Sequence, residues 1–201
     1  MDSFLSNRHP DIYKGKGITY RKYVVIDSSQ KNKEYIEDDS DRLPKDIENL
    51  GFIDIFSGKY RINVTSPLMV CPFGFNRQSH TMSLQFTNLK TNSEMQSFYE
   101  FIQKVEFQQM RYLGLSEEET DLYLSQIRYD KKGKYDPTLI VKIPFNNQNR
   151  YDVEMKNKDS DCSISKIYNF SKLQCDIYID KIWKFNGRYV CKWKASKVYI
   201  H

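Results

Sequence analysis

Large aromatic rings and positive charges alternate along one stretch near the end of the chain. Almost every second position from 181 to 194 carries one or the other, on either side of a two-residue turn. These residues are Lys181, Trp183, Phe185, Arg188, Lys192 and Lys194. Flat aromatic faces stack on other planar rings, and Lys and Arg side chains hold anions. The pattern therefore indicates binding chemistry rather than catalysis.

Residues suited to catalysis or metal binding are scarce by comparison. The histidines are far apart (His9, His80 and His201), and so are the cysteines (Cys71, Cys162, Cys175 and Cys191). No CxxC pair or metal-ligand spacing is present, and the glycines at 15 and 17 are not followed by the strand-to-helix pattern of a phosphate loop. We expect no enzyme activity, no metal and no cofactor.

The dipeptide Asn186-Gly187 predicts a β-hairpin, because a two-residue type I′ turn needs positive φ at both positions. In the resulting register Trp183 lies opposite Val190, Lys181 opposite Lys192, and Ile179 opposite Lys194. Opposed lysines repel unless an anion lies between them. The second face is the predicted core side, with Lys184 as an exception beside the turn. Its residues are Tyr178, Ile182, Tyr189, Cys191, Trp193 and Ala195.

Rings beside cations suit single-stranded nucleic acid, since each unpaired base offers a face for stacking and each phosphate a charge. The turn with Lys131, Lys132 and Lys134 would supply a secondary basic rim. The other interpretation is a solvated strand face whose rings are covered by the N-terminal arm. The pattern is equally compatible with both.

Charge is distributed unevenly over the 201 residues, whose net value is only +5. Residues 128–201 carry 16 Lys and Arg against 8 Asp and Glu, whereas residues 28–54 carry 4 against 8. The acidic segment 34–48 is interpreted as a solvated loop, with a nucleic-acid mimic or a docking arm as the alternative. The sequence has no apolar run of membrane-spanning length and no secretory signal, so we expect an intracellular protein with free thiols.

Strand patterns dominate the rest of the chain. Period-two alternation or β-rich composition predicts strands at 18–27, 60–65, 81–87, 137–145, 150–155, 162–170, 173–185 and 188–200. A helical period after Asn92 and a capping box at Ser116 predict a helical insertion over about residues 92–126. We therefore predict a mainly β barrel or sandwich of five to seven strands with a helical insertion. Residues 1–50 would form an arm and residues 51–201 the domain.

The stretch from Lys172 to Ile200, containing IDKIWKFNGRYVCKWKASKVYI, resembles the last strands of phage-type single-stranded-DNA-binding proteins of large nucleocytoplasmic DNA viruses. The segment Tyr135 to Phe145, YDPTLIVKIPF, is similar to the strand before them in that family. The resemblance implies an OB-like barrel that binds single-stranded DNA in viral replication or repair.

This chain departs from the family pattern at Val190, where a small residue is expected, and it ends without the family's acidic tail. A virion structural protein that uses the same surface for protein packing is therefore the alternative. The expected partners are single-stranded nucleic acid, DNA rather than RNA, then replication or virion proteins and a second copy of the chain, with no membrane. The expected location is the host cytoplasm or the virion.

Overall fold

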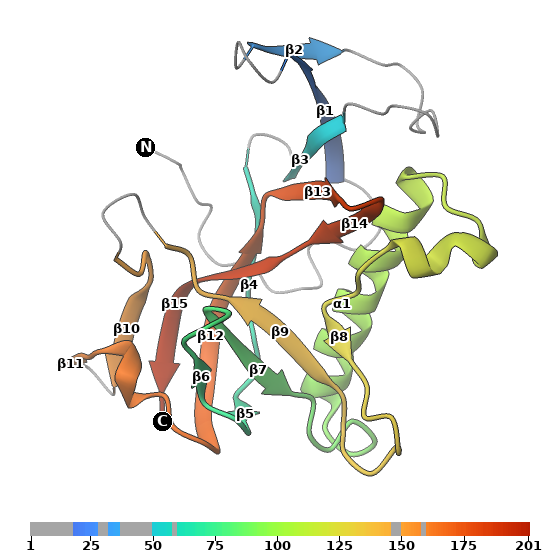
Figure 1. Cartoon of the computed structure of the whole chain (residues 1–201). Helices are drawn as coiled ribbons and strands as arrows, with labels where there is room; N and C mark the ends of the chain where they lie inside the picture. The colour runs from blue at the N-terminus through green and yellow to red at the C-terminus, as the bar shows by residue number, and fades with distance from the viewer. Residues whose placement is uncertain (1–17, 28–31, 37–49, 58–59, 146–149, 158–159) are drawn as a thin grey trace.

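The chain is mainly β in the computed structural model, which describes residues 18–27, 32–36, 50–57, 60–145, 150–157 and 160–201 (Figure 1). Its described strands form a ten-stranded sheet that closes on itself and a smaller five-stranded sheet. The predicted fold class, a mainly β barrel with a helical insertion, is confirmed. Most of the acidic segment, from residue 37 to 48, lies outside the described residues.

Five strand positions form the barrel. They are β4 (Ile62–Thr65) with β5 (Met69–Cys71), β7 (Thr81–Gln85), β9 (Thr138–Lys142), β12 (Ser171–Ile179) and β15 (Trp193–Ile200). Around the ring β5 pairs with β7, β7 with β9, β9 with β15, β15 with β12, and β12 with both β4 and β5. Only the β9–β15 pair of this ring is parallel. This is the strand order of an OB-fold, a five-stranded Greek-key barrel.

Alternation along the strands produces the core. Met82 and Leu84 of β7 and Leu139 and Val141 of β9 point inward and are buried, while the residues between them face outward. Trp193 of β15 is fully buried against the same interior. The outward-facing side chains of β7 and β9 therefore lie on the outside of the barrel and do not pack in its core.

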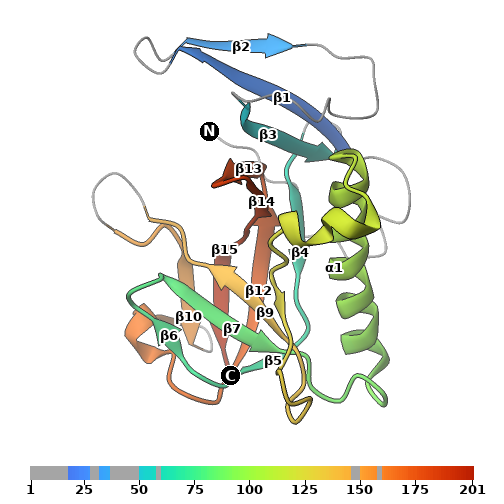
Figure 2. The same ribbon diagram turned by 45° about the vertical axis from the view of Figure 1, so that its right-hand side comes forward.

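The insertion between β7 and β9 is helical, as predicted. Helix α1 (Ser93–Tyr112) begins where the Asn92 side chain accepts a hydrogen bond from the Met95 amide at 3.0 Å. Its apolar stripe packs on the barrel, with the Phe101 ring 6.1 Å from the ring of Trp193. The predicted capping box opens η2 (Glu117–Leu122), a 3-10 helix, and β8 (Ile127–Arg128) leads into β9. Figure 2 shows α1 along one side of the barrel.

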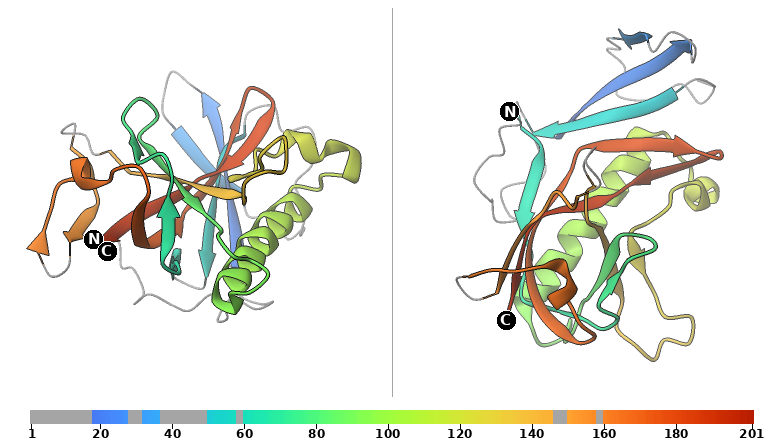
Figure 3. Two further views of the ribbon diagram at one scale, coloured as in Figure 1. Left: turned by 90° about the horizontal axis from the view of Figure 1, so that it is seen from below. Right: turned by 60° about the vertical axis from the view of Figure 1, so that its left-hand side comes forward.

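The predicted hairpin is present as β13 (Lys181–Phe185) and β14 (Arg188–Cys191). Asn186 and Gly187 have φ of 49° and 74°, as a type I′ turn requires, and Trp183 lies opposite Val190. The hairpin connects β12 to β15 and is the edge of the smaller sheet. That sheet continues through β3 (Leu50–Ser57), β1 (Ile18–Asp27) and β2 (Asn32–Ile36), above the barrel in Figure 3, right.

One predicted strand is wrong. Residues 162–170 form η3 (Ile164–Lys166) and a turn, because Ser163 caps the 3-10 helix and Phe170 has a positive φ of 63° that interrupts an extended chain. The predicted strand at 150–155 begins later, as β10 (Glu154–Asn157), which pairs with β11 (Ser160–Asp161) and with β15. The short β6 (Phe75–Asn76) lies in the connection between β5 and β7.

Candidate nucleic-acid interface

Lys181 of the hairpin lies beside a carboxylate of the neighbouring strand β3. It lies opposite Asp54 of β3, with 3.2 Å between Lys181 Nζ and Asp54 Oδ1, and its Nζ stands 3.7 Å from the centre of the Phe52 ring. Since Asp54 belongs to β3, which borders β13 on the side away from β14, the opposition of Lys181 and Lys192 stays a prediction. The hairpin ladder ends at the Ile182–Cys191 pair, and a third strand from the N-terminal part of the chain supplies the neighbour of Lys181.

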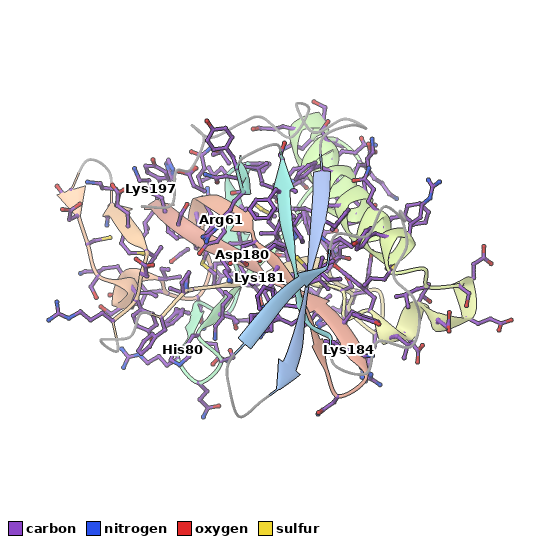
Figure 4. The ribbon with its side chains drawn as sticks, turned by 90° about the horizontal axis from the view of Figure 1, so that it is seen from above. Arg61, His80, Asp180, Lys181, Lys184 and Lys197 are labelled. Carbon is purple, nitrogen blue, oxygen red and sulfur yellow. The ribbon has the colours of Figure 1, made fainter. Side chains whose placement is uncertain are left out.

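Lys194 is likewise neutralised. It lies opposite Tyr178 in β12 and not opposite Ile179 as predicted, because the chain passes from one sheet to the other at Asp180 and again at Lys192. Its Nζ donates to both carboxylate oxygens of Asp180 at 2.8 Å. Figure 4 shows Asp180 and Lys181 side by side where the two sheets meet. These lysines hold the base of the hairpin through ion pairs.

Trp183 is an exposed ring of the hairpin. Its side chain is 43% exposed, and the remainder packs on Phe52 with 5.2 Å between ring centres. The side chain of Phe185 lies outside the described residues. The opposite face is buried as predicted, including Ile182 and Tyr189. One ring suited to stacking is thus available on the face that sequence alternation predicted.

The cations nearest the turn differ in their surroundings. Arg188 is exposed, and Lys184 is partly buried with its Nζ 5.7 Å from the centre of the Tyr189 ring. Figure 4 shows Lys184 out toward the end of the hairpin, away from Asp180 and Lys181. Lys192, where the chain passes from β14 to β15, is also exposed. Within the described residues, neither Arg188 nor Lys192 forms an ion pair with a carboxylate.

Lys142 of β9 is a cation that the sequence analysis did not select. Burial lowers its pKa below the ordinary value, and the nearby positive charge of Lys192 lowers that pKa further. Its Nζ donates to the backbone oxygen of Ser79 at 2.7 Å. Alternation in PTLIVKIPF could have placed Lys142 on the outward face. Its proximity to Lys192 depends on the parallel β9–β15 pair, which joins segments far apart in sequence.

Lys142 and Lys192 lie at one end of the outward face of β7 and β9. The other outward positions are Thr81, Ser83, Gln85, Thr138 and Ile140. In OB-folds this face and the connections between strands one and two and between strands four and five bind oligonucleotides. By strand order, those connections are residues 72–80 and the β13–β14 hairpin here.

The basic turn of Lys131, Lys132 and Lys134 is exposed. Asp130 fixes it, since its carboxylate accepts from the Lys134 amide at 2.7 Å while its backbone oxygen accepts from Gly133 at 3.0 Å. The turn connects β8 to β9 and so stands at the opposite end of the face from Lys142.

A pocket of about 430 Å³ opens beside this turn. Four exposed rings line it: Phe73, Tyr129, Tyr135 and Phe170. Gln85 and Thr138, paired in neighbouring strands, belong both to the pocket and to the β7–β9 face. Sequence reasoning missed the pocket because its rings come from three separate segments with no common spacing.

In the described part of the chain, His, Cys, Asp and Glu side chains do not cluster in an arrangement that could bind a metal ion. Among the described helices, none has the length and apolar character needed to cross a membrane.

Of the comparisons with known proteins, only the one with solved structures found a match. No protein-family model matches the sequence, and no curated protein matches it. Among solved structures, the fold is similar to that of the single-stranded DNA-binding protein from bacteriophage Enc34, solved in complex with single-stranded DNA. The identity is 8%, the match covers 75% of this chain and 86% of that one, and the TM-score is 0.42. At this TM-score the backbones coincide only in part, and no residue correspondence follows.

Proposed function

We propose that this protein binds single-stranded DNA, without catalysing a reaction, on the outward face of β7 and β9 between the 72–80 connection and the hairpin. The observation that carries the proposal is the pair Lys142 and Lys192. The register of the parallel β9–β15 pair places Lys142 opposite Lys194, two residues from Lys192, and the charge of Lys192 lowers the pKa of Lys142. Neither Lys142 nor Lys192 forms an ion pair with a described carboxylate. A phosphate between them would remove the repulsion.

The other residues take roles according to their surroundings. Trp183 stacks on an unpaired base, with Phe185 as a second ring, and Arg188 contacts phosphate beside them. Lys184 contributes from the edge of the turn, and Lys131, Lys132 and Lys134 form a basic rim. Because Lys181 and Lys194 are engaged by Asp54 and Asp180, we assign them the role of positioning the hairpin.

A stacking ring requires an unpaired base, so a single strand is favoured over a duplex. We propose DNA rather than RNA as the ligand, and replication or repair of a viral genome as the setting that the resemblance in the C-terminal strands implies. The exposed ring and the cations are compatible with any base, so we expect weak sequence preference.

Tryptophan fluorescence tests the proposal directly, because of the two tryptophans Trp183 is exposed and Trp193 is buried. Titration with oligo-dT at low salt should quench the Trp183 emission, whereas a matched duplex should quench it much less. Trp183→Ala should weaken binding by roughly 5- to 150-fold, corresponding to ~1–3 kcal/mol for one stacked base.

Trp183→Phe is the matched control. It keeps a ring for stacking and leaves Trp193 as the only tryptophan, so affinity measured with a labelled oligonucleotide should change little while the quenching of tryptophan emission disappears. Wild-type protein that binds neither the single strand nor the duplex at low salt would contradict the proposal and favour protein packing as the use of this surface.

A further inference from the structure

The pocket beside the basic turn displays an unusual amount of aromatic surface to solvent. Phe73 is 74% exposed, Phe170 72%, Tyr135 63% and Tyr129 60%. Scattered exposed rings need no explanation, but rings gathered around one hollow mark binding sites. None of the four belongs to the buried core, so folding of the barrel does not account for them.

Backbone contacts hold two of these rings at the pocket. The Phe170 amide donates to the Cys71 oxygen at 2.8 Å, and the Phe75 amide donates to the Ile167 oxygen at 3.4 Å. Gly74 makes this close approach possible, because a Cβ there would lie 3.0 Å from the Ile167 oxygen, and its φ is +64°. The segments that carry Phe73 and Phe170 are thereby fixed against each other.

Phe170 occupies its position at a conformational cost. Its φ of 63° is in the left-handed region, which Gly or Asn adopts more easily than a large side chain. Neither core packing nor backbone preference explains a Phe here. Residues kept in such a conformation concentrate at functional sites, so the strain points to a role for the ring.

The segment that leads from β8 into β9 supplies the other two rings and several charges. The hydroxyl of Tyr129 is 2.8 Å from that of Tyr99 on α1, which anchors it to the insertion. Lys134 Nζ lies 5.4 Å from the centre of the Tyr135 ring. Asp130 and Asp136 line the pocket together with a single cation, Arg128, so the pocket carries less positive charge than the lysine turn outside it, where a phosphate is favoured.

We propose that this pocket takes one unstacked nucleobase of the bound strand, with Phe73 and Phe170 on one side and Tyr129 and Tyr135 on the other. The inference rests on the proposed function. The volume of about 430 Å³ lies in the range of small-ligand sites, ~300–1,000 Å³.

The pocket continues the proposed path of the strand. Thr138 at the pocket and Lys142 beside Lys192 are outward residues of the same strand, about 13 Å apart at ~3.3 Å per residue. The backbone would run from the Lys131–Lys134 turn to Lys142, and Gln85 and Thr138 would offer hydrogen bonds to the base edge.

The test compares Phe170→Gly and Phe73→Ser with Phe107→Ser, in the full chain. Phe107 is 62% exposed on α1 and lines a second hollow that shares only Tyr129 with the pocket, so it controls for loss of an exposed ring. Phe170→Gly relieves the strained backbone, so its melting temperature should equal or exceed that of the wild type. Both pocket variants should bind a labelled dT oligonucleotide roughly 5- to 150-fold more weakly, and Phe107→Ser should bind like the wild type.

A single 2-aminopurine moved along the oligonucleotide gives a second readout. Its emission should be quenched at one position by the wild type and not by Phe170→Gly. If the wild type binds while both pocket variants match it in affinity and quenching, the pocket proposal is overturned and the proposed function stands. If the wild type does not bind single strands, both fail.

Discussion

Whether a surface lysine can bind a phosphate depends on the carboxylates around it. Lys181 and Lys194 alternate with Trp183 just as the sequence predicts, yet Asp54 and Asp180 hold them in ion pairs. Lys142 and Lys192 lie near each other instead, without an ion pair to a described carboxylate. Charge type and spacing predicted which residues share a face. They could not predict the ion pair of Lys181 with Asp54, because β3, which carries Asp54, is far from the hairpin in the sequence.

The Lys194–Asp180 pair leads to a prediction for stability. The Asp180 side chain is only 10% exposed and both of its oxygens accept from Lys194. Lys194→Ala leaves that carboxylate without its cation and should lower the free energy of unfolding by about 1–3 kcal/mol.

Urea denaturation checks this, with Lys104→Ala on the exposed side of α1 as the matched loss of a lysine. The double variant Asp180→Asn, Lys194→Ala should recover part of the loss, since no buried charge is left. Equal stability of Lys194→Ala and Lys104→Ala would show that the pair does not stabilise the fold.

At the scale of helices and strands, the sequence predicted the features that depend on residues close together in the chain. Asn186-Gly187 specified the hairpin, and Asn92 specified the start of α1. The pairing of β13 with β3 and the parallel pairing of β9 with β15 have no local signal, and they decide where the hairpin stands. The strand predicted at 162–170 failed for a related reason, because the turn at Phe170 is fixed by contacts with Cys71.

Glu106 attaches α1 to the segment that leads into β8. Its carboxylate accepts from the Ser125 hydroxyl at 2.6 Å and from the Gln126 amide at 2.7 Å. Burial raises its pKa above the ordinary 4.5, although these hydrogen bonds oppose the shift. A carboxyl with a raised pKa in the folded state stabilises the protein fully below its unfolded pKa, and this contribution is lost as pH rises through the folded value.

We therefore expect Glu106→Gln to remove a pH dependence. The free energy of unfolding of the wild type relative to Glu106→Gln should fall as pH rises from about 4.5, because only the wild type must ionise a buried carboxyl. Urea denaturation of both proteins across the pH range measures the difference. A difference that stays constant with pH would contradict the raised pKa.

At the scale of the molecule, closure of the barrel brings residues that are far apart in the sequence onto one surface. The excess of positive charge in residues 128–201 indicated where a polyanion would bind, and the alternation in the hairpin indicated Trp183. The proximity of Lys142 to Lys192 and the gathering of four rings at the pocket depend on the closed barrel and its insertion. Composition and alternation thus predict where charges and exposed rings occur along the chain better than they predict which of them the fold brings together.

The salt dependence of binding tests the central claim most directly. For a single strand, log affinity falls with log salt with a slope of about −0.7 for each phosphate neutralised. The slope, measured by anisotropy of a labelled dT oligonucleotide, should be steep for the wild type. In the double variant Lys142→Gln, Lys192→Gln it should become shallower by about 0.7, for the one phosphate held between the two lysines, and in Lys104→Gln it should stay unchanged. Binding whose slope is the same in all three proteins would contradict phosphate contact at Lys142 and Lys192.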